Sequence, residues 1–238
     1  MFKKITIYST LFFFTVLCYL FFWPVPIEPK ILNLPIPPKI DGIYKPNNEL
    51  TDLIKIKTGN GPESIAIDEK GNFYTGLSSN EIVRFNIKDQ KPVSILNTFG
   101  RPLGLKWDKY SNRLLIADEQ KGILAIDSFD NSTVILDKLN AGDNEIFSVN
   151  SIDVSSEGII YFTVSSTRNN LISNETVYNE KELWKSNPSG QLISYNTLTK
   201  QIKIELKDLN FANGLVLSND ESYILFADTK SRSLKNII

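Results

Sequence analysis

The sequence predicts an all-β domain of the β-propeller type, preceded by one N-terminal membrane-spanning helix. Three observations support this. A strand, a polar turn and a second strand recur four times, two more strand-like stretches follow each of the first three recurrences, and one uncharged apolar run lies near the N-terminus. A motif that recurs at such intervals indicates an architecture built from repeated units. Four strands per unit is the composition of a propeller blade.

The N-terminal apolar run extends from Ile5 to Trp23 without a charged residue. A helix of about 20 apolar residues spans the hydrocarbon core of a bilayer. Lys3 and Lys4 precede the run, so the positive-inside rule makes residues 1–23 a signal-anchor with a cytosolic start and places the rest in the ER lumen or outside the cell. A cleaved signal peptide is the alternative, although no small residues mark a cleavage site after the bulky run. We therefore expect a single-pass type II membrane protein.

A proline-rich linker follows the anchor over residues 24–50, and it holds most of the chain's 11 prolines. Such a composition favours an extended, semi-rigid spacer between the bilayer and a domain. The propeller domain then occupies residues 51–238. Two N-x-S/T triplets, at Asn131 and Asn174, are predicted N-glycosylation sites on the side that the anchor would expose to the glycosylation machinery.

The repeated unit is a hairpin whose four copies open at equivalent positions, Glu63, Leu103, Asn150 and Asn213. Each copy runs as an apolar strand, a polar turn and a strand rich in β-branched or aromatic residues. A polar insertion around residues 166–185 lengthens the third unit and is expected to be a surface loop. A β-sandwich is the alternative fold, but its hairpins would not repeat with the same position opening each unit.

The fourth unit is expected to end after its second strand, near Asp228, so the chain would hold about three and a half blades. We interpret it as C-terminally truncated. An unclosed ring exposes sheet edges and faces, so this form is expected to be poorly stable or prone to aggregation.

Composition excludes several classes of function. The net charge of −1 is spread along the chain without a basic stripe, which argues against nucleic-acid binding. The chain has no histidine, so imidazole bases and histidine-ligated metals are excluded. Its one cysteine, Cys18, lies in the apolar run, so an intrachain disulfide and a thiolate metal cluster are excluded as well. Carboxylates, amides, hydroxyls, lysines and tyrosines remain for chemistry.

Three motifs resemble the strictosidine synthase-like family: GPESIAID at 61–68, GRPLGLKWD at 100–108 and FANGLVLSND at 211–220. The resemblance runs from about Pro37 to Asp228, and the single N-terminal anchor is similar to that of the animal members. It implies a six-bladed propeller related to paraoxonases and to gluconolactonase-type lactonases. The repeats by themselves predict a propeller without fixing the number of blades.

The residues that open the inner strands are candidates for a metal site, because a propeller brings these positions together around its axis. Glu63, Asn150 and Asn213 would supply one carboxylate and two amide oxygens, a set that suits a hard cation such as Ca²⁺. The resemblance implies the same three ligands, with a further acidic ligand on a later blade that this chain lacks, so the site is expected to be incomplete. Alternatively, the asparagines bond backbone groups at strand starts and Glu63 is solvated.

The chain also departs from its relatives at catalytic positions. By the resemblance, Leu103 and approximately Glu119 stand where paraoxonases have two histidines, and Phe99 stands where plant enzymes have a cysteine. The late-blade glutamate of true strictosidine synthases falls beyond the chain, so strictosidine synthase activity is not expected. Four aspartates at strand ends are expected to serve turns and contacts between blades rather than catalysis: Asp108, Asp118, Asp153 and Asp228.

The sequence leaves two functions open. The first is a membrane-anchored propeller with hydrolase ancestry of the arylesterase or lactonase type, in which Ca²⁺ assists hydrolysis of a small ester or lactone. Its activity is expected to be weak or absent in this form, and no residue is identified as the base. The second is a non-enzymatic membrane glycoprotein that binds a protein partner through the propeller rim.

Overall fold

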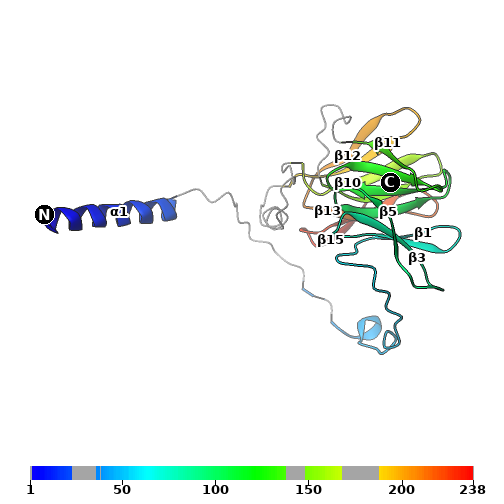
Figure 1. Cartoon of the computed structure of the whole chain (residues 1–238), viewed down its shortest axis with the longest axis horizontal. Helices are drawn as coiled ribbons and strands as arrows, with labels where there is room; N and C mark the ends of the chain where they lie inside the picture. The colour runs from blue at the N-terminus through cyan, green and yellow to red at the C-terminus, as the bar shows by residue number, and fades with distance from the viewer. Residues whose placement is uncertain (1, 23–35, 38, 138–147, 168–187, 238) are drawn as a thin grey trace.

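The computed structural model describes residues 2–22, 36–37, 39–137, 148–167 and 188–237. Its helix α1 (Phe2–Phe22) is drawn apart from a body made of strands (Figure 1). A segment of 19 residues, Lys4–Phe22, is long and apolar enough to cross a membrane, and none of it is buried against protein. These properties suit either a membrane anchor or a signal sequence. The described linker residues are mostly exposed and include one short 3₁₀ turn, η1 (Gly42–Tyr44).

The strands of the described part form four sheets, each built from strands that are consecutive in the chain and antiparallel to their neighbours. The first sheet contains β1 (Ile65–Ile67), β2 (Asn72–Gly76), β3 (Glu81–Asn86) and β4 (Val93–Asn97). The second contains β5 (Pro102–Asp108), β6 (Arg113–Asp118), β7 (Gly122–Asp127) and β8 (Ser132–Leu136). The third contains β9 (Val149–Val154), β10 (Ile159–Val164), β11 (Gly190–Asn196) and β12 (Ile202–Leu209). The fourth contains β13 (Ala212–Leu217), β14 (Ile224–Asp228) and β15 (Ser233–Ile237).

Strand β15 was not expected, because the fourth repeat was predicted to end near Asp228. Residues of β15 pair with β14 from Ser233 opposite Asp228 to Ile237 opposite Ile224. The segment is five residues long, holds only two apolar residues, and alternates half-buried with exposed side chains. So short and polar a segment carries no clear strand pattern, so the sequence did not predict it.

The sheets pack face to face, and each of the three interfaces between neighbouring sheets holds an apolar cluster. One cluster joins the first and second sheets through residues such as Ile82 and Ile116. A larger one joins the second and third sheets around Leu115 and Phe162. A third joins the third and fourth sheets around Phe226. This arrangement confirms the propeller prediction.

The first strands of the sheets, β1, β5, β9 and β13, are neighbours across these interfaces and form the inner strands. Leu215 N donates to Ser151 Oγ (3.0 Å) and Leu217 N donates to Asp153 Oδ2 (3.0 Å), so β9 and β13 run in the same direction at a constant offset. Lys106 Nζ lies 2.7 Å from Asp153 Oδ1. The buried carboxylate of Asp153 therefore connects β5, β9 and β13.

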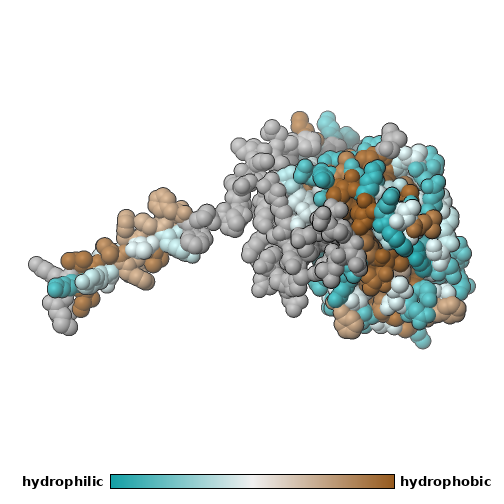
Figure 2. All heavy atoms as spheres, turned by 90° about the horizontal axis from the view of Figure 1, so that it is seen from above, coloured by the Kyte–Doolittle hydropathy of each residue, from teal (hydrophilic) through white to brown (hydrophobic). Residues whose placement is uncertain are grey.

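Apolar side chains also lie at the surface. Figure 2 shows them along α1 and as a strip on the body of sheets. Ile65 and Ile67 of β1 are exposed in the first sheet, as are Val216 and Leu234 in the fourth. These residues lie on the outer faces of the first and fourth sheets, whose inner faces contribute to the apolar clusters.

The insertion predicted around residues 166–185 lies largely outside the described residues, as does the predicted glycosylation site Asn174. Asn131 is described and exposed at the turn before β8.

Candidate functional site

Because the inner strands run in the same direction, all four begin at one end of the propeller. We call this end the strand-start face and define it by the residues that open the inner strands: Glu63, Leu103, Asn150 and Asn213. Asn150 and Asn213 are each the second residue of their strand, and Glu63 lies two residues before β1. The fold thus brings the three predicted ligands to the same end.

The backbone enters three of these strands through the same conformation. Gly61, Ser148 and Phe211 have φ values of +60°, +52° and +68°, and each lies two residues before a predicted ligand. Ser148 and Phe211 are notable because residues with a side chain seldom adopt left-handed φ values, and strained residues cluster at functional sites. The similar left-handed φ values at equivalent positions indicate that the chain enters these three strands with the same local geometry.

The second inner strand differs from the other three. Its left-handed residue, Phe99 with φ +54°, lies four residues before Leu103. Leu103 supplies no oxygen in its side chain, so the strand with the different entry is also the strand without a candidate ligand.

The two asparagines have fixed backbones. Asn213 O accepts a hydrogen bond from Thr163 Oγ1 (2.7 Å). Asn150 O lies against Gly104, where a Cβ atom would come within 2.6 Å of it. Neither side-chain amide has a hydrogen-bond partner among the residues that the structure describes. Both asparagines are partly exposed, so neither amide is committed to another described group of the protein.

Glu63 is the acidic member of the predicted set, and its side chain is 57% exposed. Its Oε1 atom lies 3.4 Å from Nη2 of Arg101, which precedes β5 on the second sheet. Arg101 was not among the predicted site residues. It stands in the GRPLGL motif, two positions before Leu103, and that placement was the available signal.

Buried polar atoms without a partner gather at the same end of the molecule. Within the described part of the chain there are six, and five of them lie at this end: Arg101 Nη1, Asp118 Oδ2, Ser148 Oγ, Asp228 Oδ1 and Ser233 Oγ. The sixth is Trp107 Nε1. Buried polar groups left unbonded are uncommon in folded proteins, so this end carries the greater unmet capacity for polar ligands.

The aspartates at strand ends have structural roles, as predicted. Asp118 Oδ1 accepts hydrogen bonds from the backbone N–H groups of Arg101, Gln120 and Lys121. Asp108 accepts from the backbone of the following turn. These carboxylates hold turns in place.

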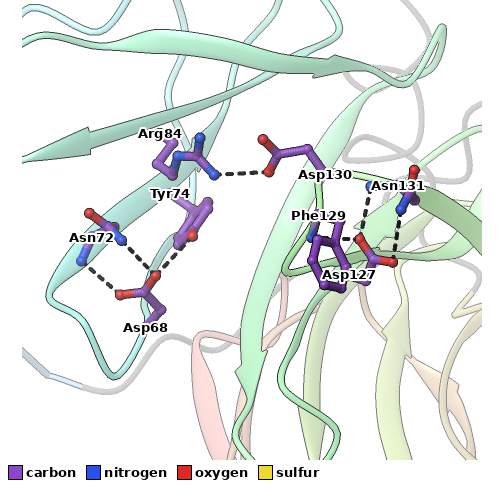
Figure 3. A network of polar contacts seen from close by, with 8 residues as sticks. All are labelled: Asp68, Asn72, Tyr74, Arg84, Asp127, Phe129, Asp130 and Asn131. Carbon is purple, nitrogen blue, oxygen red and sulfur yellow. Dashed lines mark hydrogen bonds and ion pairs between the residues drawn. The ribbon is translucent and has the colours of Figure 1, made fainter.

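The opposite end of the propeller contains a polar network between the first and second sheets (Figure 3). Tyr74 stacks on Trp107 with ring centroids 5.9 Å apart, and its hydroxyl donates to Asp68 Oδ2 (3.0 Å). Burial, followed by the bond to Asp68, raises the pKa of Tyr74 to about 12. Arg84 Nη1 lies 2.8 Å from Asp130 Oδ1 and links the two sheets.

Two loops of this network share one design (Figure 3). Asp68 accepts from the backbone and side chain of Asn72, and Asp127 accepts from the backbone and side chain of Asn131. Although burial acts to raise the pKa of Asp68, the hydrogen bonds from Asn72, Tyr74 and Lys70 lower it below its usual value. The polar groups here bond one another, and a cavity of about 110 Å³ remains between them.

Two family profiles match the chain. One is described as strictosidine synthase and matches residues 150–238. The other is described as strictosidine synthase-like, N-terminal, and matches residues 42–85. Asn150 and Asn213 fall within the first match and Glu63 within the second.

Individual relatives agree with the profiles. Strictosidine synthase-like protein 6 of Arabidopsis thaliana is 30% identical over 203 residues, which cover 83% of this chain and 52% of that protein. The adipocyte plasma membrane-associated protein of Danio rerio is 28% identical over 233 residues, which cover 89% of this chain and 53% of that protein. The chain thus spans about half the length of the curated relatives it matches.

Among solved structures, a gluconolactonase from Xanthomonas campestris superposes with a TM-score of 0.60 at 16% identity. The match covers 76% of this chain and 59% of the gluconolactonase. At this level of identity the similarity concerns the fold, and it agrees with the propeller arrangement of the sheets.

Proposed function

This chain is homologous to the strictosidine synthase-like proteins, and from that relationship we propose that it is a membrane-anchored propeller of hydrolase type. In this proposal Glu63, Asn150 and Asn213 hold Ca²⁺ at the strand-start face, where a small ester or lactone binds. One observation carries the proposal: three residues with side-chain oxygens open three inner strands at equivalent positions, each two residues after a left-handed residue.

The chemistry of the donor set supports a hard cation. Carboxylate and amide oxygens are the ligands that Ca²⁺ prefers, and Ca²⁺ takes about six to eight of them. The three residues would supply part of that number, and water or other protein groups the rest. In the described residues, no group of three or more acidic, histidine or cysteine side chains could hold a metal ion, so the neutral amides are essential to the proposed site.

When bound, Ca²⁺ would polarise the ester carbonyl for attack by water. The chain's own contribution is binding and orientation: Glu63 supplies the negative charge, and the amides of Asn150 and Asn213 hold their oxygens on anchored backbones. Tyr74 is unsuited to act as a base, because its raised pKa keeps it protonated and it lies at the other end of the propeller.

The proposed location follows from the N-terminal helix. As a signal-anchor α1 would leave the propeller in the ER lumen or outside the cell, and Asn131 and Asn174 would then be glycosylated. Asn131 is exposed, which supports its use as a site. Glycosidase treatment of protein made in animal cells, compared with Asn131→Gln and Asn174→Gln, would test both the topology and the two sites.

The hydrolase proposal is tested with the full chain in detergent micelles. We expect hydrolysis of phenyl acetate that depends on Ca²⁺, falls with a chelator and falls by about tenfold or more in Glu63→Gln, because cation affinity follows the charge of the ligands. Glu69→Gln makes the same change at the opposite end and should leave the rate unchanged.

Two results would count against this mechanism. Equal turnover by Glu63→Gln and the unaltered chain would remove the role of Glu63. Absence of hydrolysis in the presence of Ca²⁺, with Ca²⁺ binding retained in calorimetry, would instead favour the non-enzymatic membrane glycoprotein that binds a partner through its rim.

A further inference from the structure

Arg101 is held firmly on the second sheet. Its backbone N–H donates to Asp118 Oδ1 (3.1 Å), and its carbonyl accepts from Glu119 N (2.9 Å). Its side chain is 18% exposed. The backbone of Arg101 is therefore fixed, and its largely buried side chain lies at the strand-start face.

From that position the guanidinium group reaches the first sheet. Arg101 Nη2 donates to Gly61 O (3.0 Å) and lies 3.4 Å from Glu63 Oε1. Gly61 is closely packed, because its φ is +60° and a Cβ atom there would come within 2.0 Å of Ser78 Oγ. Glu63, with more than half of its side chain exposed, is the partner that is free to move.

The contact between Arg101 and Glu63 is weak by two measures. Charge-assisted hydrogen bonds between nitrogen and oxygen are usually about 2.7–2.9 Å long, and this one is longer. Arg101 Nη1 is also buried without a partner among the described residues. The carboxylate can therefore be drawn away by a stronger competitor.

We propose that Arg101 sets the affinity of the strand-start face for divalent cations by competing with the cation for the Glu63 carboxylate. This inference rests on the proposed cation site. Glu63 is the one acid in the predicted ligand set, and affinity for Ca²⁺ increases with the charge of its ligands. Arg101 cancels that charge while the pair is formed, and its guanidinium repels a bound cation after the pair has opened.

Calorimetric titration of the full chain with Ca²⁺ in detergent micelles at low ionic strength tests the inference. Arg101→Gln removes the charge, so we expect it to bind Ca²⁺ about tenfold more tightly than the unaltered chain. The same substitution is then made in the Glu63→Gln variant. There Arg101→Gln should raise the Ca²⁺ affinity by only about threefold or less, because the carboxylate for which Arg101 and the cation compete is absent.

Three controls separate charge from packing. Arg101→Lys keeps the charge and should bind Ca²⁺ with nearly the affinity of the unaltered chain. Arg84→Gln removes another partly buried arginine that bridges the same two sheets, 2.8 Å from Asp130 at the opposite end, and should not change the affinity. Circular dichroism and thermal unfolding would establish that Arg101→Gln is folded, with Arg101→Met as the second neutral variant.

The outcomes distinguish this inference from the function on which it rests. If the unaltered chain binds Ca²⁺ and Arg101→Gln binds it equally or more weakly, the competition is disproved and the cation site stands. An equal gain in Arg101→Lys and Arg101→Gln would also disprove it, because the charge would not be the cause. If no variant binds Ca²⁺ at millimolar concentration, the proposed site is wrong and this inference falls with it.

Discussion

The two ends of the propeller differ in how far their polar groups are hydrogen-bonded. At the end shown in Figure 3, carboxylates, amides, a tyrosine and an arginine bond one another across the first two sheets. At the strand-start face two amides have no partner among the described residues, and five buried polar atoms are unbonded. At the end shown in Figure 3 one buried polar atom, Trp107 Nε1, is unbonded among the described residues, whereas the strand-start face holds five. This difference, rather than the size of any cavity, locates the candidate site.

The largest effect on stability is expected at Gly104 of β5, which lies against the backbone of Asn150 in β9. Gly104→Ala would place a Cβ atom within 2.6 Å of Asn150 O, and overpacking against fixed backbone should lower the free energy of unfolding by about 3 kcal/mol. Gly214 holds the equivalent position after Asn213 and has nothing within 4 Å of a Cβ atom, so Gly214→Ala is the control and should be neutral. Urea unfolding measures both, and equal losses would show that close approach is not the cause.

A matched pair of asparagines tests the comparison between the ends directly. Asn72→Ala removes the bond from Nδ2 to Asp68 (2.8 Å), so it should lower the free energy of unfolding by about 1.5 kcal/mol and leave Ca²⁺ affinity unchanged. Asn213→Ala removes an unbonded amide, so it should weaken Ca²⁺ binding about tenfold with a stability change below about 0.5 kcal/mol. Urea unfolding and Ca²⁺ calorimetry on both variants measure these effects. A loss of stability in Asn213→Ala, or a loss of Ca²⁺ affinity in Asn72→Ala, would contradict the comparison.

Tyr74 should give the end shown in Figure 3 a characteristic dependence on pH. Its pKa in the folded state is about 12, above the ordinary value of 10.0, so its stabilising contribution is complete below pH 10 and is lost as the pH rises toward 12. Tyr74→Phe should lower the free energy of unfolding by about 1 kcal/mol at neutral pH and flatten this alkaline decline. Unfolding measured between pH 8 and about 11.5 would test it. If the stability of Tyr74→Phe fell equally with rising pH, the decline would be due to groups other than Tyr74.

The smallest effect is expected at the strained entry to β9. Ser148→Gly relieves a left-handed φ of +52° and should raise the free energy of unfolding by about 0.5–1 kcal/mol. Ser148→Ala removes the unbonded hydroxyl but retains the strain, so the difference between the two variants isolates the backbone contribution. Destabilisation by Ser148→Gly would mean that the conformation is not strained.

Sequence patterns predicted most of the fold because each repeat carries its own local signal. The strands of the first three sheets follow the predicted stretches closely, with β3 at Glu81–Asn86 and β11 at Gly190–Asn196. The third strand of the fourth sheet was not predicted, since it is short, mostly polar and without a regular alternation of apolar residues. The strands within a repeat can thus be predicted from the sequence, whereas a short strand that depends on pairing with its neighbour cannot.

The candidate site was predicted in part, for a similar reason. Glu63, Asn150 and Asn213 could be aligned because they open equivalent units, although their ligand remains a prediction. Arg101 could not, because its role depends on reaching a carboxylate in the preceding sheet. The left-handed conformations of Ser148 and Phe211 were also hidden, since serine and phenylalanine give no hint of positive φ.

Asp153 influences the relative positions of strands whose ligand residues it does not contact. Its carboxylate receives Lys106 from β5 and Leu217 N from β13 near the end remote from the strand starts. Asn150 and Asn213 lie on two of the strands that it joins, so the separation of those amides depends on a residue that would never touch a ligand. A mutational scan scored by Ca²⁺ affinity would rank Asp153 beside the three proposed ligands, and thermal denaturation would be needed to separate a residue that holds the strands in place from one that contacts the cation.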